Sequence, residues 1–456
     1  MEHPLPKDFT NRMKGLLQNE FTDFVAAITG KPSQTTIRLN PFKLPYSIGD
    51  DAIPVPWCPN AYYLPQRPNF TADPLLHAGV YYVQEASSMF IAEVLKQHCP
   101  LDKAVIALDL CAAPGGKSTL LSAILSPDSL IIANEVIKTR TPILLENVLK
   151  WGLPNTWVTS SDPSDFVPLN GLFDVVLIDA PCSGEGLFRK SPNAINEWSI
   201  NNVQHCSARQ RRILYNAANL VKQGGLLIYS TCTFSEEENE NNIQWLVKEH
   251  DFVSLPLRHD PQWGITETIQ SNPTQYGFRF YPHKVWGEGF FVSCLQKRGS
   301  HSIGHSKPAT QPFTKTEKQI TPLLRKWLNT PEAFTFYTKN STDIFAVNPT
   351  YAQLLPLFAT HLIVKSAGIP LGSIKGKELI PHQGLALSTQ LNDEIPRLPL
   401  TYPDAIQYLK KQTFELPNTN ATGWVAPSYQ NHPLGWIKRM SDRYNNYYPS
   451  EWRIRK

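Results

Sequence analysis

The sequence predicts a doubly wound α/β sheet domain, preceded by an N-terminal α/β extension and followed by a mixed or β-rich module. From Ala104 onward, short apolar runs alternate with helical patterns, which is typical of parallel β-α-β units. The runs hold four or more consecutive apolar residues and end at small or polar clusters, as strands buried on both faces do. At 456 residues the chain exceeds the size of one core, so we expect two or three domains.

The elements follow one another in a regular order. A helix is expected over residues 8–28, and an amphipathic helix over residues 84–97 leads into the sheet. Strands are expected at residues 105–110, 130–134, 156–160, 175–179 and 226–230, and helices at 117–125, 141–150, 208–221 and 236–249. Ser235 followed by Glu238 is a capping-box pattern for the last of these helices. A late strand at residues 289–295 is expected to close the sheet at its edge.

Changes in composition set the expected domain boundaries. Residues 1–100 form the N-terminal region and residues 101–297 the sheet domain. Residues 298–318 are polar and lack apolar periodicity, which indicates a linker. Residues 319–456 form a separate module, whose short expected strands include residues 334–337, 344–347 and 423–425.

Charge is distributed unevenly along the chain. Residues 1–300 contain 25 Lys and Arg against 29 Asp and Glu, a balance of −4, whereas residues 301–456 contain 18 against 10, a balance of +8. This asymmetry predicts that the C-terminal module meets a polyanion.

The seven cysteines are odd in number and scattered, without CxxC spacing. This pattern argues against a disulfide framework and against a zinc site, so we expect reduced thiols, the cytosol and no metal. The N-terminus lacks the apolar run of a signal peptide, and no run approaches the roughly 20 apolar residues that span a bilayer. We therefore expect a cytoplasmic monomer without membrane contact.

Two cysteines end predicted strands of the same sheet. Cys182 lies in FDVVLIDAPCSGEG and Cys232 in GGLLIYSTCTF. Because ligands of open parallel sheets lie outside the carboxyl ends of the strands, both thiols should overlook one crevice. A third strand end, LDLCAAPGGKST, supplies small residues and a helix start where a nucleoside can touch backbone. Two thiols beside such a cradle suggest covalent catalysis.

Two carboxylates follow the next strands. Glu135 comes 26 positions after Asp109, close to where such sheets place an acid on ribose hydroxyls, and Asp162 follows the third strand, where it is placed to accept from an adenine amine. The GxGxxG pattern of dinucleotide-binding sheets is absent, which disfavours a nicotinamide-dependent oxidoreductase.

The segments LDLCAAPGGKST, IDAPCSGEG and STCTFSEEENE, together with RFYPHKVWGEGFF, resemble the Nop/Sun family of S-adenosylmethionine-dependent RNA cytosine-5 methyltransferases. The tail from Gly423 to Ile454 is similar to the C-terminal RNA-binding module of a bacterial 16S ribosomal RNA member. The resemblance implies a Rossmann-like class I methyltransferase sheet and a PUA-like RNA-binding module. It also implies S-adenosylmethionine as cofactor, with contacts from Cys111, Ala112, Ala113, Pro114, Gly115, Gly116, Lys117, Glu135, Asp162 and Asp179.

Cytosine carbon 5 becomes nucleophilic only after a thiolate adds to carbon 6. By the resemblance, Cys232 is the attacking nucleophile and Cys182 assists release of the product. The Pro181-Cys182 dipeptide also matches the nucleophile of DNA cytosine-5 methyltransferases, which would favour Cys182 instead. Asp179 is assigned either to the cytosine edge or to the cofactor.

Several basic residues are candidates for binding RNA. They lie in TTIRLNP, FRKSP, SARQRR and the tail, and the strongest are Arg38, Lys190, Lys438, Arg439 and Arg443, with Asn40 and Arg209 to Arg212 beside them. We expect the tail aromatics, such as Trp436 and Tyr448, to serve mainly as core.

The sequence therefore predicts an RNA (cytosine-5-)-methyltransferase that acts on ribosomal RNA or the small ribosomal subunit. Transfer RNA as the substrate and a non-catalytic ribosome-assembly factor are the alternatives. The presence of both thiols and all the acidic cofactor positions argues against the assembly factor.

Overall fold

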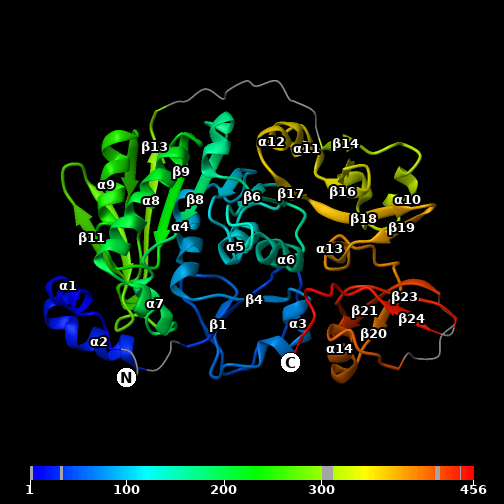
Figure 1. Cartoon of the computed structure of the whole chain (residues 1–456), viewed down its shortest axis with the longest axis horizontal. Helices are drawn as coiled ribbons and strands as arrows, with labels where there is room; N and C mark the ends of the chain where they lie inside the picture. The colour runs from blue at the N-terminus through cyan, green and yellow to red at the C-terminus, as the bar shows by residue number, and fades with distance from the viewer. Residues whose placement is uncertain (1–3, 31–33, 300–311, 416–421, 442, 456) are drawn as a thin grey trace.

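A ten-stranded sheet forms the centre of the molecule (Figure 1). It is seen in a computed structural model that describes residues 4–30, 34–299, 312–415, 422–441 and 443–455. Five parallel strands lie in the order β9-β8-β5-β6-β7. They are β5 (Ile106–Asp109), β6 (Leu130–Asn134), β7 (Thr156–Thr159), β8 (Phe173–Asp179) and β9 (Val221–Thr231). The predicted parallel sheet is confirmed.

Helices cover both faces of this sheet. On one face α8 (Ile200–Ala218) and α9 (Glu240–Glu249) bury apolar side chains such as Leu214 and Leu246. On the other face α4 (Ile91–His98) and α5 (Gly116–Ile124) bury residues such as Leu120. Helix α6 (Thr141–Trp151) follows β6. Because the chain runs from β5 outward to β7 and then returns to β8, the strand order reverses between β5 and β8, where ligands of such sheets lie.

The sequence predicts that the late strand lies at the edge of the sheet, and this prediction is wrong. Strand β13 (Phe290–Lys297) pairs with β9 and lies inside the sheet, because β12 (Gln275–Phe280) and β10 (Phe252–Leu255) both pair with its outer side. One edge is formed by β17 (Val364–Ala367), and the other by β11 (Thr266–Gln270) together with β10, which pairs with β13. Full burial of nearly every residue of β13 agrees with this interior position.

The N-terminal region contains helices and a small sheet. Instead of one helix over residues 8–28, the chain forms α1 (Lys7–Leu17) and α2 (Phe21–Thr29), because Gln18 adopts a positive φ of 48° between them. Their aromatic residues pack against Phe188, Trp198 and Phe234 of the sheet domain. A four-stranded sheet follows, consisting of β2 (Ile53–Pro54), β3 (Ala61–Tyr63), β1 (Thr36–Leu39) and β4 (Tyr81–Val83), with α3 (Pro74–His77) before β4.

The C-terminal part contains two further sheets (Figure 1). The first comprises β14 (Phe313–Lys315), β15 (Thr335–Lys339), β16 (Asp343–Val347), β18 (Ile369–Lys375) and β19 (Glu378–Pro381). The second comprises β20 (Arg397–Pro399), β21 (Gly423–Tyr429), β22 (His432–Pro433), β23 (Ile437–Arg439) and β24 (Tyr444–Asn446). The helices of this part are α10 (Thr321–Arg325), α11 (Pro349–Ala352), α12 (Leu355–His361), α13 (Gln383–Ala386) and α14 (Tyr402–Leu409).

The C-terminal part contributes one strand to the central sheet. Strand β17 pairs with β7, and Phe358 of α12 packs edge-on against Trp157 of β7. The middle of the predicted linker, residues 300–311, lies outside the described residues.

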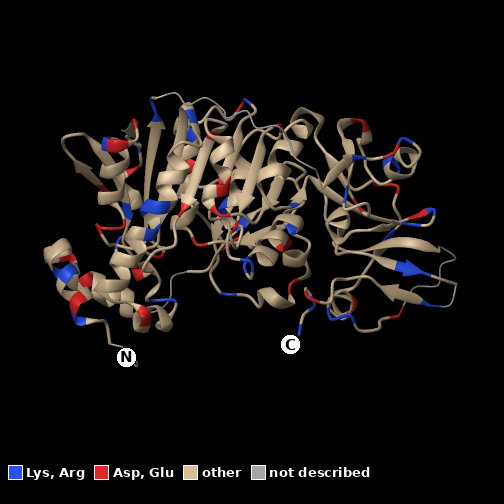
Figure 2. Ribbon diagram, turned by 45° about the horizontal axis from the view of Figure 1, so that its top comes forward, with Lys and Arg blue, Asp and Glu red and all other residues tan. Residues whose placement is uncertain are grey.

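Charged residues of both signs are interspersed over the whole ribbon, the C-terminal part included (Figure 2). Among the described helices, none has the length and apolar character needed to cross a membrane.

Candidate functional site

The structure brings the two strand-end cysteines together. Cys182 follows β8 and Cys232 follows β9, and their Sγ atoms lie 3.2 Å apart. The proximity results from the parallel register of the two strands, in which Asp179 pairs with Ser230. Both side chains are only partly buried, and all seven cysteines are free. The two thiols thus lie side by side just after the carboxyl ends of neighbouring strands.

Two buried glutamates hold the loops that carry these thiols. Glu238 accepts hydrogen bonds from the backbone N–H of Ser183 at 2.9 Å and from the side-chain amide of Gln210 at 2.8 Å. Glu185 accepts from the backbone N–H of Phe234 at 2.8 Å. Each acid follows one cysteine and fastens the loop of the other, so the distance between the thiols is fixed from both sides.

The predicted capping role of Glu238 is wrong. Helix α9 starts at Glu240, and the Glu238 carboxylate is directed to the Ser183 loop instead. Burial raises the pKa of Glu238 to about 6. The sequence signal for both glutamates was their position, three residues after Cys182 in CSGEG and six residues after Cys232 in CTFSEEE, and our sequence reasoning missed it.

Lys117 and Asp179 form an ion pair beside the thiols. Lys117 Nζ lies 2.7 Å from Asp179 Oδ2, and Asp179 Oδ1 accepts from the hydroxyl of Ser230 at 2.8 Å. Burial by itself lowers the pKa of Lys117, but the charges of Asp179, Asp109 and Cys232 raise it above the ordinary value. Lys117 is therefore an ammonium at neutral pH, close enough to Cys232 to interact with its charge.

The two thiols differ in electrostatic environment. The hydrogen bond with Cys232, together with burial, raises the pKa of Cys182 well above its usual value. Cys182 therefore remains a thiol that can donate its S–H to a Cys232 thiolate. The thiolate is the reactive form of cysteine, so a protonated Cys182 is suited to donate a hydrogen bond rather than to attack.

The glycine-containing loop between β5 and α5 forms the wall of the crevice. Gly115 caps α5 with a φ of +113°, and a Cβ there would lie 3.3 Å from Leu144 Cδ1. Two side chains of the α6 region hold the loop carbonyls, with Arg140 donating to Ala113 and Asn147 donating to Pro114. A cavity of about 170 Å³ lies against this loop, lined by Tyr82, Val83, Gln84, Glu85, Ser88, Cys111, Ala112, Ala113, Pro114, Gly116, Lys117 and Asp179. Burial raises the pKa of Cys111, which keeps that residue an unreactive thiol.

Three further carboxylates lie near this loop, although none of them lines the cavity. Glu135 is buried and accepts from the backbone N–H of Ile137 at 2.8 Å. Asp162 caps the 3-10 helix Pro163–Leu169, and the hydrogen bond from Ser164 N–H lowers its pKa. Asp109 accepts from the Ser118 hydroxyl through Oδ2, while its Oδ1 is buried without a partner among the described residues. Burial raises the pKa of Asp109 to about 7.

An exposed apolar pair follows Glu135. Val136 and Ile137 are 47% and 48% exposed, which is unusual for aliphatic side chains next to a buried strand. Our sequence reasoning missed them, although their signal is the apolar dipeptide directly after a strand-end carboxylate. A flat apolar ligand group would cover this pair.

The prediction that Arg38 and Asn40 contact RNA is wrong. Arg38 is only 1% exposed and donates to Gln84 Oε1 at 3.0 Å and to Thr119 Oγ1 at 2.7 Å. Asn40 is also buried and donates to backbone carbonyls. A phosphate cannot reach either side chain. Arg38 instead ties β1 to the first turn of α5, so it supports the glycine-containing loop.

The other basic candidates lie at the surface. Lys190 and Arg443 are exposed, and Arg439 is partly exposed. Lys438 is paired with Glu378 at 2.7 Å and lies over the ring of Trp424. The candidates of α8 lie on its solvent side, where Arg212 is 3.8 Å from Asp162. Trp436 and Tyr448 are buried, which confirms that they belong to the core.

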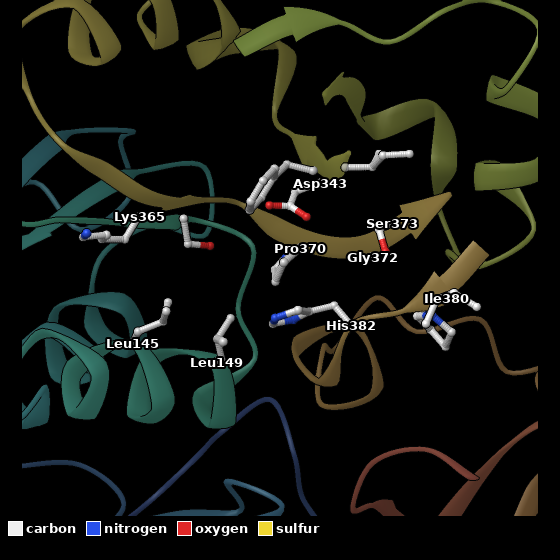
Figure 3. A pocket seen from close by; sticks show the side chains of 13 residues that line it. Leu145, Leu149, Asp343, Lys365, Pro370, Gly372, Ser373, Ile380 and His382 are labelled. Atoms are coloured by element: carbon white, nitrogen blue, oxygen red, sulfur yellow. The ribbon is translucent and has the colours of Figure 1, made fainter. Parts of the chain in front are cut away.

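A second cavity, of about 380 Å³, lies between α6 and strands β16 and β18 (Figure 3). His382, Asp343 and Lys365 line it, and no cysteine does. Helix α6 separates it from the glycine-containing loop, because Leu144 and Asn147 face that loop while Leu145 and Leu149 face this cavity. The crevice with the two thiols is therefore the candidate active site.

Three segments of the chain match known families. Residues 99–296 match the family described as 16S rRNA methyltransferase RsmB/F. Residues 5–86 match the N-terminal domain of 16S rRNA methyltransferase RsmF, and residues 396–454 match the methyltransferase RsmF PUA domain.

Curated relatives show the same similarity. The chain is 34% identical over 318 residues to ribosomal RNA small subunit methyltransferase F of Pectobacterium atrosepticum, an alignment that covers 65% of this chain and 63% of that protein. It is 29% identical over 476 residues to the protein of the same name from Escherichia coli, where the alignment covers 98% of this chain and 96% of the relative.

Solved structures share the central fold. A methyltransferase homolog protein from Pyrococcus horikoshii has a TM-score of 0.54 and 29% identity, covering 64% of this chain and 95% of its own. NSun6 from Pyrococcus horikoshii with SFG has a TM-score of 0.53 and 21% identity, covering 65% of this chain and 99% of its own, which is a likeness of fold.

Proposed function

The chain belongs to the RsmB/F family of methyltransferases, and we propose that it transfers a methyl group to carbon 5 of a cytidine in 16S ribosomal RNA. Its sheet is the Rossmann-like methyltransferase sheet, its C-terminal domain is a PUA domain, and its cofactor is S-adenosylmethionine. The observation that carries the proposal is the pair of thiols 3.2 Å apart, just after the carboxyl ends of two neighbouring strands of the methyltransferase sheet. Because the proposed substrate is ribosomal RNA, we place the enzyme in the cytoplasm.

The residues of the crevice suit this cofactor. The loop from Cys111 to Lys117 and the start of α5 offer backbone to the nucleoside and amino-acid parts. The unpartnered Asp109 Oδ1 suits the ammonium group of the cofactor's amino-acid part, and Glu135 suits the hydroxyls of its ribose. The exposed Val136 and Ile137 suit the adenine ring, and Asp162 its amine. When bound, S-adenosylmethionine supplies the methyl group that carbon 5 takes up.

Cys232 starts the proposed reaction. Its thiolate forms a bond with carbon 6 of the cytosine. The electrons of the 5,6 double bond then shift toward carbon 4 and N3, which leaves an enamine whose carbon 5 is nucleophilic. The positive charge of the Lys117 ammonium, which is paired with Asp179, opposes the negative charge that develops on the ring. Asp179 is placed to accept a hydrogen bond from the cytosine amino group, and its ion pair with Lys117 orients both groups.

Cys182 acts in product release. After methylation, carbon 5 loses its proton to water in the crevice, the 5,6 double bond forms again, and the sulfur of Cys232 departs as a thiolate. The neighbouring Cys182 thiol, 3.2 Å away and held protonated, donates its S–H to this leaving group. Without that donor, the covalent RNA adduct should persist.

The experiment measures transfer of labelled methyl groups to separate pools of unmethylated 16S ribosomal RNA and transfer RNA, followed by bisulfite mapping. We expect 5-methylcytidine in the ribosomal RNA, no activity for Cys232→Ala, and accumulation of a covalent complex for Cys182→Ala. The reverse behaviour of the two variants would reject the assigned roles. Cofactor binding without methylation of either RNA would favour an assembly factor, and methylation of transfer RNA alone would overturn the proposed substrate.

A further inference from the structure

A second groove borders the active-site crevice. It has a volume of about 400 Å³ and is lined by Gln34, Thr35, Thr36, Leu64, Pro65, Gln66, Arg67, Val83, Gln84, Glu85, Lys190 and Glu288. Val83, Gln84 and Glu85 also line the cavity against the glycine-containing loop. The two hollows therefore adjoin each other at the end of β4 and the two residues after it.

The acidic residues of the groove are bound by the protein itself. Glu85 accepts from the backbone N–H groups of Ser87 at 2.9 Å, Ser88 at 3.0 Å and Glu288 at 2.8 Å. Glu288 is paired with Arg189 at 3.0 Å, and both of these side chains are almost fully buried. The charge of Glu288 is thus compensated inside the protein, and the carboxylate of Glu85 is occupied by backbone N–H groups. The exposed charges along the groove are those of Arg67 and Lys190, and both are positive.

An exposed tryptophan lies at the end of the groove. Trp286 is 58% exposed, and its ring meets the ring of Tyr63 edge-on, with 5.7 Å between centroids. The next residue, Gly287, packs so closely that a Cβ there would lie 2.7 Å from Glu85 Oε1. The backbone after Trp286 is therefore fixed to the groove wall. The indole ring is held in place at one edge and presents a surface to solvent on which a base can stack.

We propose that this groove holds the single-stranded RNA that flanks the target cytidine, with Arg67 and Lys190 at its phosphates and Trp286 stacked on an unpaired base. This inference rests on the proposed function, because it assigns the path of the substrate to and from the same crevice. A target base must leave its stack to reach Cys232, and the flanking nucleotides must then be held as single strand. Cationic side chains together with an aromatic platform are the means by which proteins hold single strands.

The test compares the double variant Arg67→Ala/Lys190→Ala with the wild-type enzyme on unmethylated 16S ribosomal RNA. We expect the KM for RNA to rise at least about tenfold, with kcat at saturating RNA and cofactor binding unchanged. Loss of two phosphate contacts on a single strand should reduce the slope of log K against log salt by about 1.4. The control is Lys103→Ala/Lys222→Ala, which removes the same charge at the amino ends of β5 and β9.

The tryptophan is tested separately. Trp286→Ala should raise the KM for RNA, and Trp286→Phe, which retains an aromatic face, should restore most of the loss. An Arg67→Ala/Lys190→Ala enzyme that matches the control variant in KM and salt slope would overturn the groove while leaving the proposed function intact. A wild-type enzyme that methylates no RNA would instead reject the proposed function itself.

Discussion

Lys117 of α5 and Asp179 at the end of β8 form an ion pair in the wall of the cavity at the glycine-containing loop, with Nζ and Oδ2 2.7 Å apart. This ion pair connects the glycine-containing loop to the strand that leads to Cys182. It also keeps Lys117 an ammonium, because the charge of Asp179 opposes the effect of burial on the pKa of Lys117. The ion pair therefore links the cofactor loop to the strand end that carries Cys182.

Asp179→Asn removes the carboxylate of this pair. We expect kcat to fall by about 10²–10³, because the ammonium loses its orienting partner and the cytosine loses an acceptor. Asp174→Asn is the matched control, since Asp174 forms an ion pair with Lys222 at the other end of β8. Steady-state kinetics of methyl transfer measure both variants. Equal activity of the two would show that the Asp179 carboxylate has no special role.

Gly115→Ala forces a side chain onto a backbone with a φ of +113° and toward Leu144. Left-handed backbone at a non-glycine residue costs about 1–2 kcal/mol, and displacement of the loop should weaken binding of S-adenosylhomocysteine about tenfold. Gly224→Ala is the control, because Gly224 also has a positive φ but has no atom within 4 Å of its Cβ position. Titration calorimetry measures the affinity of both variants for S-adenosylhomocysteine. Equal affinities would contradict the proposed role of the loop in binding the cofactor.

Arg38→Ala tests the correction to its predicted role. Removing a buried, hydrogen-bonded guanidinium should lower the free energy of unfolding by about 3 kcal/mol and weaken cofactor binding. The salt dependence of RNA binding should stay unchanged, because the side chain cannot reach a phosphate. Urea denaturation and RNA titrations provide the comparison. A reduced salt slope at wild-type stability would restore Arg38 to the RNA interface.

The pKa of Glu238 predicts a pH dependence of stability. Its pKa of about 6 in the folded protein lies above the ordinary 4.5. Its contribution to the free energy of unfolding is therefore fully present below about pH 4.5 and is lost as the pH rises through 6. The shift corresponds to about 2 kcal/mol. Between pH 4.5 and 7, the wild-type protein should lose about that much stability relative to Glu238→Gln in urea unfolding. A constant difference over this range would exclude a raised pKa.

The parallel strands were predictable because each is a compact apolar run that ends at a polar cluster, and the position of Cys182 and Cys232 followed from those strand ends. The interior position of β13 in the sheet could not be predicted, because strands that pair over a long distance in sequence leave no local pattern. The same limit applies to β17, which reaches the central sheet from the C-terminal part.

Burial of polar residues was the least predictable property of the site. Arg38 in TTIRLNP and Glu238 in SEEENE have the composition of exposed segments, yet both are buried and hydrogen-bonded across more than 45 residues of sequence. Only tertiary packing decides whether such a side chain faces RNA or the protein core. The exposure of Trp286 could not be foreseen for the same reason.

The central claim is that the sulfur of Cys232 bonds to the substrate and that Cys182 releases it. The most direct measurement is mass spectrometry of the nuclease- and protease-digested complex that Cys182→Ala forms with unmethylated 16S ribosomal RNA and S-adenosylmethionine. We expect a nucleotide carrying the transferred methyl group on the peptide that contains Cys232. A nucleotide attached to any other residue, or turnover by Cys182→Ala without a covalent complex, would contradict it.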